Sequence, residues 1–321
     1  MEPYCAPWWL PGRHVQTMVA PLLACAQRVH YDRRERWTAP DGDFIDVDWA
    51  GPESAPRLLV LFHGLEGNSS SHYARAIGAR ALSMGGWRFA LPHFRGCSGE
   101  LNRTARAYHA ADSPEIDWIL RRFADRHVAV YAAGVSLGAN ALLKWLCEQG
   151  DEAAHVVRRA AAVSSQLDMV AFGNTIGRGF NRVYGWFFLY LTQLRSKALV
   201  KMARFSDEHA ALGVSEPRVR AATTLPAFDD ALTAPLHKFR DKLDYWTQGS
   251  TVKLLSNIRV PTLLLNARND PFLPARVLPE PADVPGNLAL DFPQDGGHAG
   301  FPGRKQWLAR RVLEFLADPE S

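Results

Sequence analysis

The sequence predicts an α/β protein with a mainly parallel central sheet, helices on both of its faces and a helical insertion. Three observations lead to this class. Short apolar runs alternate with helical patterns along the chain, the alternation stops between residues 166 and 251, and it resumes at Ile258. Nearly continuous apolar runs are typical of strands that are covered on both faces, and their alternation with helices favours parallel strands.

Five short runs are predicted to be strands, and most of them are nearly continuous apolar runs of the kind that helices cover on both faces. They span residues 58–62, 88–91, 128–133, 262–266 and 288–292. An antiparallel strand is expected before them. Ile45, Val47 and Trp49 alternate with aspartates after a Pro-Asp-Gly turn, which predicts a strand with one apolar and one polar face.

Helices are predicted at four places between or after these runs. Residues 72–84 carry alanine and isoleucine at helical spacing and end at two glycines. Asp112 is placed to cap the next helix, with Pro114 in its first turn and Glu115 at the capping-box position. The other two predicted helices span residues 139–146 and 307–316.

The chain is expected to divide into three segments. Residues 1–165 form the N-terminal part of the α/β core, 166–251 the helical insertion, and 252–321 the C-terminal part of the core. The insertion is rich in aromatic residues, Arg and Asp, and it contains no clear buried strand. We interpret it as a lid over the sheet. A second helical domain with its own core is the alternative that the sequence leaves open.

Composition excludes several classes of protein. The 321 residues carry a net charge of only +4, and the densest basic run, residues 33–36, is interrupted by Glu35, so nucleic-acid binding is not expected. The four cysteines are far apart, which argues against a disulfide scaffold or zinc site and favours free thiols in the cytoplasm. The apolar run 183–194 is shorter than the roughly 20 residues of a membrane span, so no stable membrane anchor is expected.

The strongest chemical signal is the run Gly134-Val135-Ser136-Leu137-Gly138, which fits the GxSxG pattern. A predicted strand comes directly before it and a predicted helix directly after it. In that setting the tight turn strains the serine backbone and projects the hydroxyl above the sheet. Ser136 is therefore predicted to be a catalytic nucleophile.

A serine hydroxyl is a poor nucleophile at neutral pH, so it needs a base, and the base needs an acid to orient it. His298 lies in a glycine-rich loop after the last predicted strand. Asp270 follows another strand, at the carboxyl end where sites gather in open α/β sheets. Asp291 and Asp295 compete for the role of the acid, but their closeness to His298 places them in the same strand and loop. The order Ser136, Asp270, His298 matches that of hydrolases with an elbow serine.

An acyl-transfer site also needs N–H donors for the oxyanion of the tetrahedral intermediate. One should be the backbone N–H of Leu137, directly after the nucleophile, and the other that of Leu65, in the loop after an early strand. His63 and Glu66 are expected to hold this loop in place. The sequence contains no HExxH, P-loop or dinucleotide fingerprint, so neither a cofactor nor a metal is expected.

The aromatic cluster at residues 180–190 of the insertion has two possible roles. Most of its rings are expected to form the core of the lid, because a docked helix needs an apolar stripe. Residues 184–191 are apolar nearly all round, however, which is more than one stripe requires. Trp186 and Phe187 are therefore predicted to face the cleft and bind a lipophilic acyl group.

Taken together, these motifs resemble the YheT-like branch of the α/β-hydrolase superfamily, with its embryogenesis-associated and abhydrolase-domain members. The likeness runs over nearly the whole chain and depends on residues 14–17 (HVQT), 63–69 (HGLEGNS), 92–100 (PHFRGCSGE), 115–118 (EIDW) and 269–272 (NDPF). The family implies a Ser-Asp-His esterase without a metal and with a helical lid. Those roles carry over to Ser136, Asp270 and His298. The chain departs from many members at Ala139, where they carry Gly.

The expected function is hydrolysis of a small-molecule carboxylic ester, with a lipophilic acyl group, through an acyl-enzyme. A phospholipase or acyltransferase with the same triad is one alternative. A binding protein that keeps the fold without turnover is another, although such a protein has no need of Asp270 and His298 together. The sequence gives neither the physiological substrate nor the oligomeric state.

Overall fold

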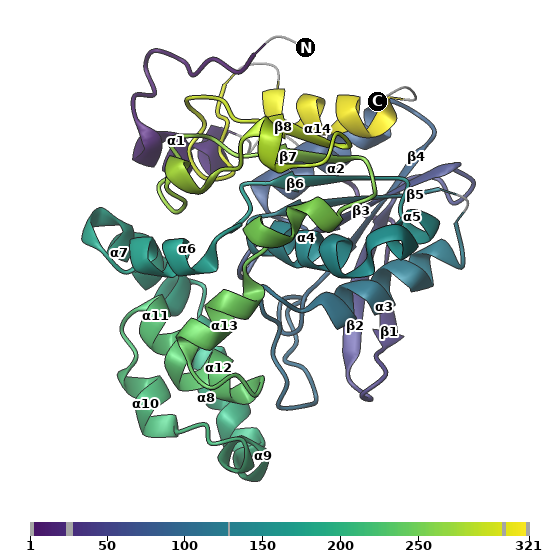
Figure 1. Ribbon diagram of the computed structural model, residues 1–321. Coiled ribbons are helices and arrows are strands. Elements are labelled where there is room, and N and C mark those ends of the chain that lie inside the picture. Colours follow the sequence, from purple (N-terminus) through teal and green to yellow (C-terminus); the bar gives the residue numbers. More distant parts are fainter. Residues whose placement is uncertain (1–2, 24–27, 128, 304–305, 319–321) are drawn as a thin grey trace.

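An eight-stranded sheet forms the centre of the computed structural model, which describes residues 3–23, 28–127, 129–303 and 306–318 (Figure 1). The spatial order is β1-β2-β4-β3-β5-β6-β7-β8. The β1–β2 and β2–β4 pairs are antiparallel, and all other neighbours are parallel. The expected mainly parallel sheet is confirmed. The strands are β1 (Arg33–Thr38), β2 (Phe44–Ala50), β3 (Arg57–Phe62), β4 (Trp87–Pro92), β5 (Val130–Val135), β6 (Arg159–Val163), β7 (Thr262–Leu265) and β8 (Leu288–Asp291).

All five predicted strands are present, as β3, β4, β5, β7 and β8, and the alternating run is β2. β8 is at the edge of the sheet and is only partly buried. Residue 128, where the predicted run 128–133 begins, lies outside the described residues, and β5 starts at Val130. Two strands were missed. β1 is a charged segment, and β6 contains three alanines in a row, a residue type that is depleted in strands. β6 lies between β5 and β7 and is buried along its whole length, so small side chains leave room for helices on both faces.

The polar face of β2 does not meet solvent as its alternation predicted. Asp46 and Asp48 are buried, and each lies directly opposite an arginine of β1 in the antiparallel register. Arg36 donates two hydrogen bonds to Asp46 (2.7 and 2.8 Å), and Arg34 donates two to Asp48 (2.6 and 2.9 Å). Such bidentate pairs are strong and directional. The basic run at residues 33–36 therefore serves strand pairing.

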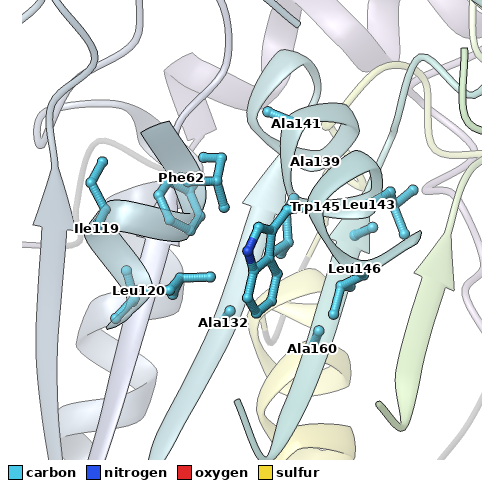
Figure 2. Packing of buried hydrophobic residues seen from close by; sticks show 14 of the residues in the cluster. Phe62, Ile119, Leu120, Ala132, Ala139, Ala141, Leu143, Trp145, Leu146 and Ala160 are labelled. Atoms are coloured by element: carbon cyan, nitrogen blue, oxygen red, sulfur yellow. The ribbon is translucent and has the colours of Figure 1, made fainter. Parts of the chain in front are cut away.

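Helices cover both faces of the sheet. On one face, α2 (His72–Ser83) and α14 (Trp307–Ala317) pack against each other and over the central strands. On the other, α3 (Ser113–Ala124) and α4 (Leu137–Gln149) bury the larger apolar cluster. Figure 2 shows Phe62, Ile119, Leu120 and Trp145 meeting between these helices and the strands. The Trp145 indole N–H donates to the Asp117 carboxylate (2.9 Å), so its polar atom is satisfied.

The predicted start of α3 is confirmed, but the predicted capping box is wrong. Asp112 makes no side-chain capping hydrogen bond. Its carboxylate accepts instead from Arg106 (2.6 Å), and that of Glu115 accepts from Arg95 (2.6 Å). Both carboxylates are buried, and a buried carboxylate is stabilised more by an arginine than by one backbone N–H.

The segment between β6 and β7 contains helices and no strand among its described residues. These helices lie to one side of the sheet (Figure 1) and share an apolar cluster that includes Ile176, Leu189 and Val219. Ala105 and Phe272 of the sheet-bearing part also belong to that cluster, so the insertion packs on the core rather than standing apart. Its elements are α6 (Met169–Ile176), η3 (Gly179–Asn181), α7 (Arg182–Trp186), η4 (Phe187–Leu191), α8 (Leu194–Arg204), α9 (Ser206–Ala211), α10 (Glu216–Ala221), α11 (Leu225–Phe228), η5 (Asp229–Thr233), α12 (Ala234–Leu236), α13 (Lys242–Gly249) and η6 (Val252–Asn257).

The remaining described elements are α1 (Arg13–Leu23), η2 (Gly150–Glu152), α5 (Ala153–Val156), η7 (Ala275–Val277) and η8 (Pro281–Asp283). Within the described ranges, every helix is too short or too polar to cross a bilayer.

Cys5, Cys97 and Cys147 are free thiols, and Cys25 lies outside the described ranges. Burial raises the pKa of the Cys97 thiol, and it raises the pKa of the Cys147 thiol to about 12. Both thiols therefore stay protonated and are poor nucleophiles.

Candidate active site

Ser136 occupies the sharp turn between β5 and α4. Its backbone has φ 56° and ψ −117°, a conformation that costs a non-glycine residue strain and that is found mainly at functional sites. The flanking glycines make the turn possible. A methyl group at Gly134 would lie 2.6 Å from the Cα of Ala139, and one at Gly138 would overlap the carbonyl oxygens of Phe62 and His63. The GxSxG pattern is thus explained by backbone crowding.

The structure brings the three predicted triad residues together. His298 Nε2 lies 2.8 Å from Ser136 Oγ, and His298 Nδ1 lies 2.8 Å from Asp270 Oδ2. Because an ionised carboxylate only accepts, Nδ1 carries the proton and Nε2 is free to accept one from the serine. The other Asp270 oxygen accepts from the N–H of Phe272 (2.8 Å). The Asp270 side chain is only 1% exposed, so the carboxylate is held by hydrogen bonds on both sides.

Gln16 links the two loops that carry Asp270 and His298. Its side-chain oxygen accepts from Asn269 (2.9 Å) and from the N–H of Gly296 (2.9 Å), and its amide donates to Asp295 (3.2 Å). Asn269 also donates to Asp295 (2.8 Å). Gln16 is 1% exposed. It lies beside the triad without touching it, and its contacts fix the distance between the two loops.

Thr17 supports the histidine directly. Its hydroxyl donates to the carbonyl of Arg13 (2.7 Å) and accepts from the backbone N–H of His298 (2.9 Å). The sequence contained a signal for both α1 residues, the HVQT block, but no spacing argument assigned them a role. Only the fold brings residues 16 and 17 to a loop some 280 positions later.

The two acids that competed with Asp270 have other partners. Asp291 accepts from Arg311 (2.6 Å), and Asp295 accepts from Gln16 and Asn269. Neither contacts His298 in the part of the chain that the structure describes. Asp295 therefore supports the loops, whereas Asp270 faces the imidazole.

Both predicted oxyanion donors lie in segments next to the serine. Leu137 is the first residue of α4, so its N–H has no partner within the helix and lies at the positive end of the helix dipole. Leu65 belongs to the loop after β3, where a methyl group at Gly64 would lie 3.2 Å from the Cβ of Ser136. No described residue accepts a hydrogen bond from the Leu65 N–H. The loop and the helix thus both contact the turn.

Buried side chains hold the Leu65 loop in place. His63 donates from Nδ1 to the carbonyl of Gly64 (2.8 Å) and accepts at Nε2 from the N–H of Phe94 (3.0 Å). Burial lowers the pKa of His63 to about 3, so the ring stays neutral. The Tyr108 hydroxyl accepts from the Glu66 N–H (2.8 Å) and donates to the Glu66 carboxylate (2.9 Å). These contacts fit the structural role expected of His63 and Glu66.

A cavity of about 120 Å³ begins beside the predicted oxyanion donors and extends between the core and the insertion. Leu65 and Leu137 form its near wall. Its far walls are mainly apolar residues of the insertion, namely Met169, Phe172, Leu194, Ala198, Leu225, Phe228, Leu232 and Leu236. Charged or polar side chains also line it, namely Glu66, Arg95, Lys197, Lys201, Asp229 and His237. The described residues contain no group of three or more His, Cys, Asp or Glu that could hold a metal ion.

Trp186 and Phe187, the predicted acyl-binding residues, do not line this cavity. They are 50% and 45% exposed on the outside of the insertion, and other insertion residues form the cavity wall. The buried face of the same segment carries Tyr184 and Leu189. Periodicity identified a segment with more than one apolar face, but it could not tell which face meets the core, the cavity or the solvent.

The fold and the elbow turn define a class of protein. Residues 57–304 match the family model described as alpha/beta hydrolase fold, and the chain belongs to that family. The mainly parallel eight-stranded sheet with its helices agrees with that fold.

Individual proteins of this family are similar to the chain over most of its length. The chain is 35% identical over 314 residues to "Putative esterase YheT" of Escherichia coli, with 94% of this chain and 89% of that protein covered. It is 28% identical to mouse phospholipase ABHD3, covering 98% of this chain and 78% of the relative. The solved esterase Pf2001 of Pyrococcus furiosus shares the fold with a TM-score of 0.57 at 14% identity, over 90% of this chain and 92% of that one. The resemblance to the YheT-like branch is confirmed.

Proposed function

We propose that the protein hydrolyses carboxylic esters through an acyl-enzyme formed on Ser136. The observation that carries this proposal is the unbroken chain of two 2.8 Å contacts from Ser136 through His298 to Asp270. His298 takes the serine proton as Ser136 attacks the ester carbonyl, and Asp270 stabilises the imidazolium that results. The imidazolium then returns the proton to the leaving alcohol.

The second half of the reaction uses the same residues. His298 accepts a proton from a water molecule as the water attacks the acyl carbonyl. The bond between the acyl carbon and Ser136 Oγ then breaks, the imidazolium returns the proton to Oγ, and the carboxylic acid leaves. The N–H groups of Leu65 and Leu137 stabilise the oxyanion in both steps. One such donor is worth on the order of 10²–10³ in kcat.

We infer that the acyl group is lipophilic and occupies the cavity behind Leu65 and Leu137. The apolar insertion residues that line it support this assignment. The names of the relatives, an esterase and a phospholipase, agree with ester chemistry on lipophilic substrates. In this proposal the helices between β6 and β7 act as the lid. That the enzyme works in the cytoplasm stays a prediction from its scattered cysteines.

The proposal is tested with p-nitrophenyl esters and a fluorophosphonate probe. The wild-type protein should hydrolyse the esters and take up one probe molecule per chain. Ser136→Ala should lose both activities, with kcat lower by about 10⁶. Ser70→Ala, an exposed serine close to the Leu65 loop, is the matched control and should label like the wild type. Stoichiometric labelling of Ser136→Ala would identify a different nucleophile.

A further inference from the structure

The insertion presents an apolar stripe to solvent. Val183, Trp186, Phe187 and Leu191 are 48%, 50%, 45% and 60% exposed. Val183 and Trp186 are three residues apart, and Phe187 and Leu191 are four apart. This spacing places the four side chains on one side of the continuous helical segment that α7 and η4 form. A helix needs one apolar stripe to stay docked, and Tyr184 and Leu189 already provide it. The outer stripe therefore has no partner within the described structure.

A second exposed apolar stripe lies next to the first. Met18 and Leu22 of α1 are one turn apart and are 44% and 70% exposed. Trp8 and Trp9, in the segment before α1, are 91% and 50% exposed. His14, one turn before Met18, joins the two stripes: its ring lies 4.5 Å from that of Phe180 and 3.2 Å from the Tyr184 hydroxyl. Figure 1 shows α1 and α7 on the same side of the molecule. We call the two stripes together the outer apolar face.

Positive charge surrounds the outer apolar face. Residues 169–206 contain six Lys or Arg and no Asp or Glu, and residues 3–31 contain Arg13 and Arg28 and again no acidic residue. Two of the six do not contribute to the outer surface, because Lys197 pairs with Glu66 and Lys201 is buried. Arg13, Arg178 and Arg182 are exposed, and none of the three forms an ion pair within the described ranges. Over the whole chain the net charge is only +4, so this concentration of unpaired basic side chains is local.

The face also lies close to the proposed catalytic centre. The ring of Tyr184 is 4.8 Å from that of Phe272, and the ring of Phe272 is 4.3 Å from that of His298. On the other side, α1 contacts the same histidine through Thr17. A surface bound to the outer apolar face is therefore two side chains away from the triad.

We propose that the outer apolar face docks on an anionic lipid membrane, with its aromatic rings in the headgroup region and its arginines against lipid phosphates. Exposed apolar patches of this extent mark interaction sites, and tryptophan together with basic residues favours the membrane interface. Charge decides against a second copy of the chain. A two-fold contact would place Arg178 and Arg182 of one copy near those of the other, whereas anionic lipids neutralise them. This goes beyond the proposed function, because docking requires no ester cleavage.

The test uses vesicles and the full chain carrying Ser136→Ala, so that lipid is not consumed. Phosphatidylcholine vesicles with and without phosphatidylglycerol are pelleted with the protein at low and high salt. Binding is expected only with phosphatidylglycerol and should weaken with salt, since surface charge is screened. Trp186→Ser/Phe187→Ser should bind roughly tenfold more weakly. Leu243→Ser, which removes a 54% exposed leucine of α13, is the matched control and should bind like its parent.

Charge reversal tests the second half of the proposal. Arg178→Glu/Arg182→Glu should weaken binding at least tenfold, since each basic residue near an anionic surface contributes about fivefold. Lys253→Glu/Arg259→Glu changes the net charge equally at exposed sites in and after η6 and should have little effect. Thermal melting of each variant shows that it is folded, and turnover of a soluble ester by the same variants with Ser136 restored separates loss of docking from loss of the site.

Three results would overturn the proposal. The first is equal binding to both kinds of vesicle, and the second is binding that Trp186→Ser/Phe187→Ser leaves unchanged. The third is a wild-type dimer in sedimentation velocity that the same double substitution converts to a monomer, which would make the face a contact between copies of the chain.

Discussion

Strand β2 and the α7–η4 segment both carry residues that their surroundings do not favour, and they resolve the conflict in opposite ways. β2 buries two carboxylates, and the chain supplies an arginine opposite each of them. The α7–η4 segment exposes four large apolar side chains, and the described chain supplies nothing to cover them. A residue that is compensated within the chain serves the fold. One that is left uncompensated points to something outside the chain.

Among the residues that support the serine, the largest expected effect on kcat comes from the buried carboxylate of Asp270. Asp270→Asn should lower kcat by roughly 10⁴, because the amide favours the wrong histidine tautomer and no longer stabilises the imidazolium. Asp295→Asn is the matched control: Asp295 bonds Gln16 and Asn269 but not His298, and its loss should cost far less. Initial rates with a p-nitrophenyl ester measure both. Equal losses would mean that Asp270 is not the orienting acid.

A smaller effect on kcat is expected when Gln16, which holds the two loops together, is removed while Ser136, His298 and Asp270 are kept. Gln16→Ala should lower kcat by about ten- to a hundredfold, because the loops carrying Asp270 and His298 lose their shared partner and the triad geometry loosens. KM should change little, since Gln16 does not line the cavity. Gln248→Ala, in α13, should leave both constants unchanged. A rise in KM at constant kcat would assign Gln16 to substrate binding.

Buried histidines should make the folded protein sensitive to acid. Burial lowers the pKa of His63 and of His109 to about 3, and it lowers that of His237 as well. In the unfolded chain the same rings take up protons below a pH of about 6.5. The unfolded state therefore binds more protons between these values, and the free energy of unfolding should fall as pH falls, by about 1.4 kcal/mol per pH unit for each histidine.

Urea denaturation at a series of pH values measures this slope. His63→Gln should reduce the slope of the free energy of unfolding against pH by the contribution of one histidine. His155→Gln, at an exposed site, should not change that slope. Burial also raises the pKa of Glu115 to about 7 and that of Asp229 to about 6, which contributes a slope of the opposite sign, so the difference between His63→Gln and the wild type is the quantity that decides. A slope that His63→Gln leaves unchanged would show that this ring is protonated in the folded protein.

The smallest effects separate the two sides of the insertion. Trp186→Ala and Phe187→Ala should leave the dependence of kcat/KM on acyl length within about twofold of the wild type, because both residues face outward. Leu232→Trp should shorten the preferred chain, because Leu232 lines the cavity and each excluded methylene costs up to about 0.8 kcal/mol. Esters from acetate to long chain provide the series. A profile that shifts in Phe187→Ala and not in Leu232→Trp would restore the outer residues as the acyl site.

Features carried by a local pattern could be predicted from the sequence. The apolar strands, the elbow turn at Ser136 and the loop of His298 each have a signal within about ten residues. What could not be predicted depends on partners far apart in sequence. The arginines of β1 and the Asp112 carboxylate make sense only beside Asp48 and Arg106, and Gln16 only beside the loops near residues 269 and 296.

The sequence also could not predict which side of the apolar segment at residues 184–191 faces solvent. The helical segment from Tyr184 to Leu191 is apolar on nearly all sides. Its hydrophobic periodicity therefore cannot distinguish a face toward the cavity from a face toward solvent. Packing of Tyr184 and Leu189 into the insertion decides the matter and directs Trp186 and Phe187 outward.

The acyl-enzyme itself is the most direct object to measure. Rapid quenching with acid after mixing with a slowly hydrolysed p-nitrophenyl ester, followed by mass spectrometry of the digested chain, locates the acyl group. The proposed function predicts one acyl adduct on the peptide that contains Ser136, formed in a burst of p-nitrophenol equal to the enzyme present, and no adduct in Ser136→Ala. Full turnover with no trapped adduct, or an adduct on another residue, would contradict it.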